Sequence, residues 1–489
     1  MGICCKKKHV IAIQYEGIGV TYDELKNKIT ELSHSLELYT NGKNVPVIIY
    51  MDRGNDFIIA MLACMVSGCF YIPVIKSTPI ERINHIVEDS GCRLAIVDER
   101  FSDSRIKQIN MTTTEVYNLD VTLEESVWGK KYSDIAYIMY TSGTTGVPKG
   151  VIISNCNLQN LINSFGNIIY NRISGTVNVA VLASFGFDSS VKQIYSSLYY
   201  GHTLVIAKES DKKFSKLLQK FYDDNSIYIS DGTPSNMKGL TLTRKKINNN
   251  VKYFIIGGEN FQCDVARAMY DKHENEIEII NVYGPTECCV DVSYYTVGKD
   301  SLDGDYIPIG KPLLNTKLCI LDENNREICE SGVRGELVVF GQQVGYGYTN
   351  ENNMKFSFGD DMFDNSYHTG DVASYDDNMQ IVILGRKDNQ IKKNGYRIEL
   401  DEVAINIKKL KNISDAVVRK RNYNGNEKIV AYIVCDNGNG QDDILEKLNG
   451  YLPHYMVPDI VINIEEVPLN INGKVDEKKL ADLYESQKV

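Results

Sequence analysis

The sequence predicts an α/β fold in which a largely parallel sheet is covered by helices on both faces. Short apolar runs alternate with amphipathic helical patterns through much of the chain. Most of the runs are continuously apolar, which is typical of strands buried on both faces. A length of 489 residues allows about three folding units.

The N-terminal elements follow from these patterns. A short hairpin starts near Val10, and Thr21 then caps a helix, with Glu24 placed to complete a capping box. The apolar face of this helix carries Leu25, Ile29, Leu32 and Leu36. Further helices are expected at residues 57–66, 81–87 and 157–169, and buried strands at 45–51, 94–97, 135–140, 151–153, 179–182 and 277–282.

A second, smaller domain is predicted after two more strands, at residues 335–339 and 380–384. The composition changes at residues 385–397, which are rich in Lys, Arg, Asn and Gly, and we place the boundary there. The remainder is expected to hold helices at 403–410 and 444–452 and strands at 416–418 and 429–434.

Composition excludes several classes of protein. A formal net charge of −11, with no basic stripe to offset it, argues against a nucleic-acid partner. No apolar run approaches the ~20 residues of a membrane helix, and the start is not a secretory signal, so we expect a cytoplasmic protein without a membrane partner. The twelve cysteines lack zinc-site spacing and are expected to be reduced.

The first eight residues, Met1 to Lys8, have two interpretations. A Gly at position two, two cysteines and a basic run together suggest dual acylation. Position six is Lys rather than Ser or Thr, which favours a plain start.

A loop rich in Gly, Ser and Thr joins the predicted strands at 135–140 and 151–153. It contains Thr141, Ser142, Gly143, Thr144, Thr145, Gly146 and Lys149. Amide and hydroxyl donors in such a loop can surround the oxygens of a polyphosphate, and Lys149 adds a charge. The loop does not match the Walker A pattern, because a strand rather than a helix follows it. A flexible polar hairpin is the alternative, and the loop alone does not decide between them.

The strand at 277–282 runs into a second candidate motif. Gly284 and the proline after it force a turn at the strand end, where open α/β sheets place ligands. There Tyr283 offers a flat face for a base, Thr286 a hydroxyl for phosphate, and Glu287 an oxygen ligand for magnesium. A capped turn with a stacked core tyrosine is the alternative.

Three further residues stand out singly. Asp188 can cap the following helix or anchor a substrate ammonium. Asp371, expected on a tight glycine turn, is suited to chelating two ribose hydroxyls. Lys474, on a Gly turn near the C-terminus, taken alone is expected to be a solvated surface lysine.

In this order and at these spacings, the motifs resemble those of the adenylation domains of nonribosomal peptide synthetases, members of the adenylate-forming superfamily. The resemblance runs from Thr21 to Lys474. It implies an adenylate-forming fold: a large N-terminal domain of layered α/β subdomains with a small barrel, residues 1–387, and a small mobile α+β C-terminal lid, residues 388–489, with a hinge at Asp388.

The resemblance also implies a nucleotide site for ATP and Mg²⁺. The loop from Thr141 to Lys149 would hold the β- and γ-phosphates, Tyr283 would stack on adenine beside Gly284, and Asn281 would reach the adenine amino group.

The remaining roles by resemblance concern catalysis and the ribose. Thr286 would bind the α-phosphate and Glu287 the magnesium ion, while Asp371 and Arg386 would bind the ribose side. Lys474 would bridge the substrate carboxylate and the α-phosphate. Catalysis would then be positioning and charge neutralisation, with Lys474, Glu287 and Lys149 as catalytic residues.

The same matching implies an amino-acid substrate. Asp188 would pair with its α-amino group, and the side-chain pocket would be lined by Lys192, Asp231, Ile255, Gly257, Val282, Val290 and Asp291. Two carboxylates and one ammonium favour a polar or basic side chain, such as that of ornithine, lysine or arginine. Lys192 leaves two other interpretations open, since it can neutralise one Asp or bind an acidic substrate.

The reaction expected from the resemblance is formation of aminoacyl-AMP and pyrophosphate, followed by transfer to the phosphopantetheine thiol of a carrier protein. The chain stops about 15 residues after Lys474, too few for a carrier domain, so we expect a stand-alone ligase with the carrier in trans. One alternative is a D-alanine carrier-protein ligase, against which the charged pocket argues. Another is a non-catalytic binding or scaffold relative, against which the retained motifs argue.

The chain departs from the family pattern at several positions. Gln343 replaces a usual Gly, Gly345 and Tyr346 replace a small residue and Arg, Ile75 replaces Asp, and His368 replaces Arg or Lys. The shape of the loop around Gln343 is therefore open.

Overall fold

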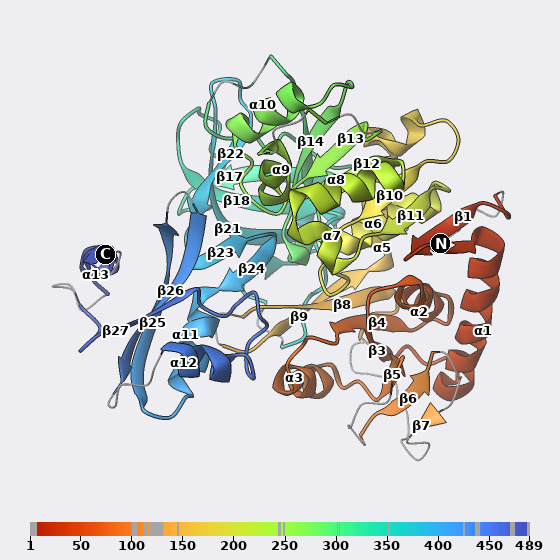
Figure 1. The fold of residues 1–489 in the computed structure, drawn as a ribbon, viewed down its shortest axis with the longest axis horizontal. Coiled ribbons are helices and arrows are strands. Elements are labelled where there is room, and N and C mark those ends of the chain that lie inside the picture. The colour runs from red at the N-terminus through yellow and green to blue at the C-terminus, as the bar shows by residue number, and fades with distance from the viewer. Residues whose placement is uncertain are drawn as a thin grey trace. The chain divides into compact units, whose positions relative to one another are not determined.

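The structure, a computed structural model, describes residues 7–99, 105–111, 116–117, 131–143, 146–242, 246–247, 250–300, 302, 304–350, 353–423, 426–435, 441–469 and 475–486 (Figure 1). Its internal contacts divide the chain into two compact units. The first comprises residues 1–76, 87–140 and 150–387, and the second residues 77–86, 141–149 and 388–489.

An eight-stranded sheet forms one part of the first unit, in the order β19-β9-β8-β4-β3-β5-β6-β7. Its central pairs β3–β4, β3–β5, β5–β6 and β4–β8 are parallel, as the sequence predicts. The strands are β3 (Pro46–Met51), β4 (Phe70–Ile75), β5 (Leu94–Val97), β6 (Lys107–Asn110), β7 (Val116–Tyr117), β8 (Ile135–Thr141), β9 (Lys149–Ser154) and β19 (Gly347–Tyr348).

The first unit holds α1 (Tyr22–Thr40), α2 (Asn55–Val66) and α5 (Asn155–Ile168), whereas α3 (Ile80–Ser90) crosses from the second unit to the first after residue 86. The expected start of α1 is confirmed, since Thr21 and Glu24 form a reciprocal capping box. The expected apolar face of α1, from Leu25 to Leu36, is buried.

A nine-stranded sheet forms the second layer of this unit, in the order β16-β15-β14-β13-β12-β10-β11-β1-β2. Its strands are β1 (Ile11–Tyr15), β2 (Ile18–Thr21), β10 (Asn178–Val181), β11 (Thr203–Ile206), β12 (Ile227–Gly232), β13 (Tyr253–Ile256), β14 (Glu278–Tyr283), β15 (Ser293–Val297) and β16 (Lys311–Pro312). The run from β14 to β1 is parallel, and β2, β15 and β16 are antiparallel to their neighbours.

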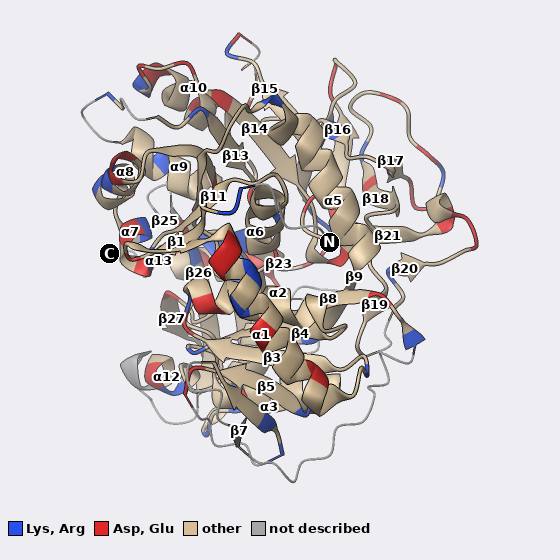
Figure 2. Cartoon of the chain, turned by 90° about the vertical axis from the view of Figure 1, so that its right-hand side faces the viewer, with Lys and Arg blue, Asp and Glu red and all other residues tan. Residues whose placement is uncertain are grey.

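Both faces of the nine-stranded sheet are covered. On β10, Val179 and Val181 belong to one hydrophobic cluster and Ala180 to another, because successive strand residues point to opposite faces. The helices after its strands are α6 (Ser189–Tyr199), α7 (Glu209–Lys213), α8 (Ser215–Asp224), α9 (Pro234–Thr241) and α10 (Cys263–Lys272). Charged residues colour α1, α7 and α8, while the strands are mostly tan (Figure 2).

A five-stranded antiparallel sheet completes the first unit, where the resemblance implies a small barrel. Its strands are β17 (Thr316–Leu321), β18 (Gly335–Gly341), β20 (Phe356–Ser357), β21 (Ser366–Tyr375) and β22 (Ile381–Arg386). Short 3₁₀ turns at Tyr170–Arg172, Thr286–Cys288 and Met362–Asp364 lie elsewhere in this unit.

The second unit has its own core of α+β elements. A hairpin of β23 (Gln390–Lys393) and β24 (Tyr396–Glu399) precedes a three-stranded sheet of β25 (Ile413–Tyr423), β26 (Asn426–Cys435) and β27 (Ile460–Asn463). Its helices are α11 (Leu400–Lys408), α12 (Gln441–Leu448) and α13 (Glu477–Ser486).

Two further observations bear on the expectations from composition. No helix among the described residues is both long and apolar enough to cross a membrane. The ten cysteines in the described part of the chain form no disulfide with one another, and most of them are buried.

Candidate active site

The end of β14 carries the predicted adenine-binding group. Tyr283 is buried at the last position of the strand, and its hydroxyl donates a hydrogen bond to Oδ2 of Asp371. Burial, with the negative charge of Asp371 beside it, raises the pKa of Tyr283 well above its ordinary value. Asn281, two residues earlier, donates from Nδ2 to the carbonyl of Pro308 at 2.8 Å. Gly284 follows, where a Cβ would lie 2.2 Å from the carbonyl oxygen of Val290, so only glycine fits.

Asp371 lies inside β21 rather than on the tight turn that the sequence suggested. The ladder between β21 and β22 shifts register just after it, and Gly370 has a φ of +77°. This irregularity places the carboxylate opposite Arg386, whose Nη1 lies 2.7 Å from Oδ1. The backbone N–H of Asp371 donates to Thr369 Oγ1 at 3.0 Å. A carboxylate has about four acceptor positions, so these contacts leave it able to accept from ribose hydroxyls.

Glu287 lies in the short turn that begins with Thr286, and both residues are buried. Tyr348 donates its hydroxyl to Oε1 of Glu287 at 2.6 Å. Within the described ranges, no group of three or more His, Cys, Asp or Glu side chains is arranged to hold a metal. The single carboxylate of Glu287 fits a magnesium ion that is also bound by substrate phosphates and water, which is the usual mode for nucleotide-bound magnesium.

The Gly-rich loop between β8 and β9, from Thr141 to Lys149, belongs to the second unit. Gly143 donates its N–H to Oε2 of the buried Glu402 at 2.9 Å, and Ser142 donates its hydroxyl to the carbonyl of Arg397 at 3.1 Å. An amide of this loop is therefore directed at an anionic oxygen, as a phosphate site requires. Thr141 ends β8 and Lys149 begins β9; Gly146 has a φ of +79°. Thr144, Thr145 and the proposed catalytic Lys474 lie outside the described residues.

Asp188 occupies the N-cap position of α6, but its side chain makes no capping hydrogen bond. Asp188 therefore stands at the N-cap position that the sequence predicts, but it does not form the side-chain capping hydrogen bond. The loop from residue 184 to 188 instead turns through backbone bonds, including Phe187 N–H to the carbonyl of Ser184 at 3.0 Å.

Three charged residues of the predicted side-chain pocket meet in one buried cluster. Lys192 Nζ, on α6, lies 2.8 Å from Oδ2 of Asp231 and 2.9 Å from Oδ2 of Asp291. Only 3% of the Lys192 side chain is exposed. Burial raises the pKa of Asp231 to about 6, although Lys192 opposes the rise. The paired carboxylates raise the pKa of Lys192 despite its burial.

The apolar pocket residues come from the neighbouring strands. Ile255 pairs in register with Asp231 across β12 and β13, and Val282 lies one strand further on β14. At Gly257, a Cβ would lie 2.7 Å from the carbonyl oxygen of Val282, so glycine is required for this close approach. Val290 lies in the turn that leads to Asp291, and both are buried.

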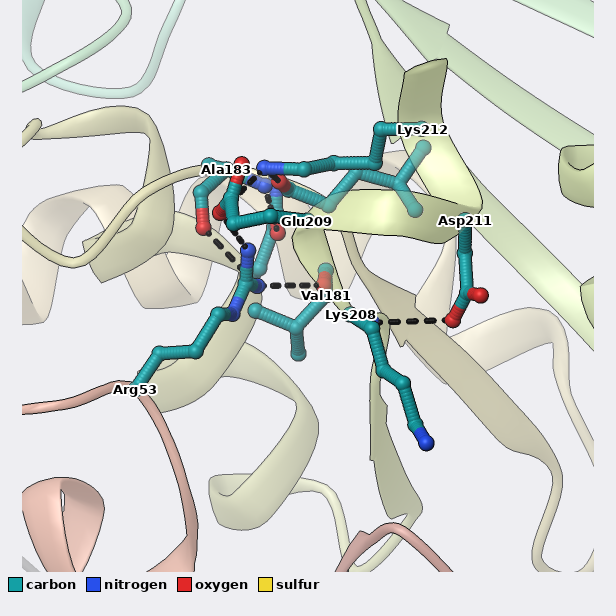
Figure 3. A network of polar contacts seen from close by, with 9 residues as sticks. Arg53, Val181, Ala183, Lys208, Glu209, Asp211 and Lys212 are labelled. Atoms are coloured by element: carbon teal, nitrogen blue, oxygen red, sulfur yellow. Dashed lines mark hydrogen bonds and ion pairs between the residues drawn. The ribbon is translucent and has the colours of Figure 1, made fainter. Parts of the chain in front are cut away.

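The sequence does not predict two side chains that support this pocket. Gln343, noted only as a departure, is fully buried against the turn that carries Val290. Arg53 donates from Nη2 to the carbonyls of Val181 and Ala183 at 2.9 and 3.2 Å, at the end of β10 that leads to Asp188 (Figure 3). In the sequence, Arg53 stands next to a glycine and before a predicted helix. This local pattern does not predict contacts with residues more than 100 positions away.

Glu209 joins the Arg53 contacts to α7. Its Oε1 lies 2.7 Å from both Arg53 Nη1 and Lys212 Nζ (Figure 3). Lys212 also donates to the carbonyl of Leu182 at 3.0 Å, so two cations bind three consecutive carbonyls. Burial, together with the charge of Arg53, lowers the pKa of Lys212 to about 8.

Comparison with solved structures defines the class of fold. The chain superposes with a TM-score of 0.82 and 23% identity on an NRPS protein containing adenylation and PCP domains, covering 97% of this chain and 82% of that one. It superposes with a TM-score of 0.81 and 23% identity on the Vibrio cholerae adenylation domain AlmE, solved with glycyl-adenosine-5'-phosphate, covering 98% and 96%. The fold is the adenylate-forming fold, as the sequence predicts.

The family follows from the sequence comparison. The model of the family described as AMP-binding enzyme matches residues 4–349, and the chain belongs to that family. It is 34% identical over 485 residues to surfactin synthase subunit 1 of Bacillus subtilis, and 34% identical over 487 residues to bacitracin synthase 1 of Bacillus licheniformis. These alignments cover 96% of this chain but 13% and 9% of the two relatives, so the chain spans a small part of their length.

Proposed function

We propose that the protein activates an amino acid with ATP, giving aminoacyl-AMP and pyrophosphate. The observation that carries the proposal is the hydrogen bond between Tyr283 and Asp371. This hydrogen bond connects Tyr283, which is suited to stacking on adenine, with Asp371, which is suited to binding ribose hydroxyls. Tyr283 lies at the end of a parallel strand, where α/β sheets bind ligands. The match to the AMP-binding enzyme family supports the same assignment.

The reaction is a displacement at the α-phosphorus. An oxygen of the substrate carboxylate forms a bond to phosphorus as the bond to the pyrophosphate oxygen breaks, and pyrophosphate leaves. Asp371 and Arg386 hold the ribose, Thr286 the α-phosphate, and Asp188 the substrate ammonium. Magnesium, when bound at Glu287, would neutralise phosphate charge. We assign Lys474 to the developing charge between the carboxylate and the α-phosphate.

The test is amino-acid-dependent ATP–pyrophosphate exchange with magnesium, across the proteinogenic amino acids, ornithine and D-alanine. Strong exchange with one of them is the expected result. Exchange with D-alanine alone would favour the D-alanine carrier-protein ligase, and no exchange with any would favour a non-catalytic relative. Lys474→Ala is expected to abolish exchange while ATP still binds, and near-normal exchange in that variant would contradict its role.

We propose further that the aminoacyl group passes to the phosphopantetheine thiol of a carrier protein. The similarity to a solved protein containing adenylation and PCP domains supports this. The thiolate attacks the aminoacyl carbonyl, a thioester forms, and AMP leaves. Incubation with a phosphopantetheinylated carrier as a separate polypeptide should increase the carrier mass by one aminoacyl group, and an apo-carrier lacking the thiol is the control.

The lid and its hinge belong to the same proposal. We infer that residues 388–489 move as a lid about Asp388 relative to residues 1–387. The division of contacts between Lys387 and Asp388 supports it. Proline at position 388 would fix φ near −65°, so Asp388→Pro should retain exchange and lose thioester formation. Equal loss of both reactions would contradict a hinge.

We propose that the amino acid has a polar side chain. The preference for a basic one rests on two carboxylates against one ammonium, and Lys192 pairs with both Asp231 and Asp291, so the buried cluster carries one net negative charge. That single charge still favours a cation such as ornithine. The buried ammonium of Lys192 supports an acidic side chain as the second candidate. Exchange with ornithine, lysine and arginine against that with glutamate and aspartate decides between them.

A further inference from the structure

The chain turns sharply between Glu287 and Asp291. Cys289 has a φ of 52° and Val290 a φ of 76°. The N–H of Asp291 donates to the carbonyl of Cys289 at 3.0 Å, which closes a three-residue γ-turn centred on Val290. A positive φ is rare for a β-branched residue, and this form of γ-turn is strained. Such a conformation persists only where the surroundings hold it.

The carboxamide of Gln343 supplies that support. Its Nε2 donates to the carbonyls of Cys288, Cys289 and Asp291 at 3.5, 3.3 and 3.2 Å. The side chain has no exposed surface. A carboxamide has two N–H groups, which the three carbonyl oxygens share. The carboxamide thus spans the γ-turn, from Cys288 just before it to Asp291 at its end.

The other end of the carboxamide is also fixed. Asn160, on α5, donates from Nδ2 to Gln343 Oε1 at 2.8 Å, and Asn315 donates from Nδ2 to Asn160 Oδ1 at 3.0 Å. Because the Gln343 oxygen accepts from Asn160, its nitrogen faces the turn. These contacts orient Gln343 before any substrate binds.

The residues that follow Gln343 hold the start of the same turn. Gly345 donates its N–H to the carbonyl of Glu287 at 2.9 Å, and Tyr348 donates its hydroxyl to the Glu287 carboxylate. The turn then presents Asp291 to Lys192 at 2.9 Å. A shift of the turn would therefore move a charged group of the side-chain pocket.

We propose that Gln343 is a positioning residue for amino-acid selection, which holds the strained turn so that Val290 and Asp291 keep their places in the side-chain pocket. This inference rests on the proposed function, because it assigns the pocket to an amino-acid side chain. Gln343 acts through Val290 and Asp291, and nothing in its role requires contact with the substrate.

The test compares selectivity rather than activity alone. The measured quantity is the ratio of kcat/KM for the best polar amino acid in the exchange panel to kcat/KM for L-leucine. Gln343→Met keeps the length of the side chain and removes its N–H donors. We expect the ratio to fall about 10-fold, since small displacements of positioning groups have large kinetic effects, while the KM for ATP changes less than about twofold. Gln342→Met, at the neighbouring glutamine, should leave the ratio unchanged.

A second variant covers the case in which Gln343→Met does not fold. Asn160→Ala frees the carboxamide of Gln343 and should lower the same ratio, whereas Asn163→Ala, exposed on the same helix, should not. In the double variant of Gln343 and Asn160 the two effects should not add, because one acts through the other. Unchanged selectivity in both folded single variants would overturn the inference. Absence of exchange in the unaltered protein would overturn the proposed function, and this inference with it.

Discussion

Arg386 and the buried Asp371 form an ion pair between two adjacent strands, with Nη1 and Oδ1 separated by 2.7 Å. The hydroxyl of Tyr283 binds the other oxygen of the same carboxylate. The group proposed to bind ribose is therefore already oriented by both the proposed adenine-binding residue and a cation.

Arg386→Met should weaken ATP binding, because it leaves the Asp371 carboxylate without its cation and less firmly oriented. We expect the KM for ATP to rise about 10- to 100-fold, with a smaller change in the KM for the amino acid. Steady-state exchange kinetics measure both. Arg334→Met, at an exposed arginine, is the control; an unchanged KM for ATP in Arg386→Met would contradict the ribose role.

Lys192→Met should destabilise the fold, because it leaves Asp231 and Asp291 buried without a cation. Breaking a buried ion pair in this way costs about 3–5 kcal/mol of unfolding free energy, measurable by urea denaturation. Adding Asp231→Asn and Asp291→Asn should recover part of the loss. The control is Lys220→Met, whose pair with Asp224 is exposed, so the unfolding free energy should stay nearly unchanged.

His202 should make the protein less stable in acid. Its ring is buried, and Nδ1 accepts from the N–H of Val177 at 3.3 Å. Burial, together with the charge of Lys7, lowers the pKa of His202 from 6.5 to about 4. Between those values the unfolded chain binds a proton that the folded chain does not, so stability falls as pH falls from about 6.5 to 4.

This contribution amounts to about 3 kcal/mol in full. Unfolding midpoints of the unaltered protein and His202→Gln, compared between pH 7 and pH 4, measure it. The variant should lose less stability over this range. Parallel curves for the two proteins would contradict the assignment.

Arg53→Gln should weaken amino-acid binding more than ATP binding. The guanidinium donates to the carbonyls of Val181 and Ala183, just before the loop of residues 184–188. It also lies 5.3 Å from the ring centre of Phe185 within that loop. Losing these contacts should loosen that loop and raise the KM for the amino acid about 10-fold.

Arg172→Gln is a matched control for this variant. Arg172 also pairs with a glutamate and lies over an aromatic ring, at Glu278 and Tyr253, but it is more exposed. If both variants change the KM for the amino acid equally, the loop contacts of Arg53 do not explain the effect.

The sequence predicts most of the first unit because local patterns determine it. Strand β5 falls on the predicted residues, and β3, β10 and β14 lie within one residue of theirs. The capping box at Thr21 is also a local signal. In the second unit, β25 is much longer than the predicted strand at 416–418, because its ladder with β26 continues into polar residues that carry no apolar pattern.

The site is only partly predictable for a different reason. Motif residues such as Tyr283 and Asp371 can be named from their spacing. The alignment that sets Asp371 opposite Arg386 depends on the pairing of β21 with β22, whose ladder shifts register just after Asp371. The bridge from Lys192 to both Asp231 and Asp291 joins three separate elements. No local pattern specifies that geometry, and the same holds for Gln343 and its turn.

The pairing of β1 with β11 has a consequence for how the chain folds during synthesis. Ile13 to Tyr15 pair in parallel with Leu204 to Ile206, so during synthesis β1 waits for about 190 more residues before this sheet neighbour exists. Closing so long a loop carries an entropic cost and slows folding. Until then the β1–β2 hairpin presents an unpaired edge that can associate with other chains. Co-expressed chaperones or slower translation should therefore raise the yield of folded protein.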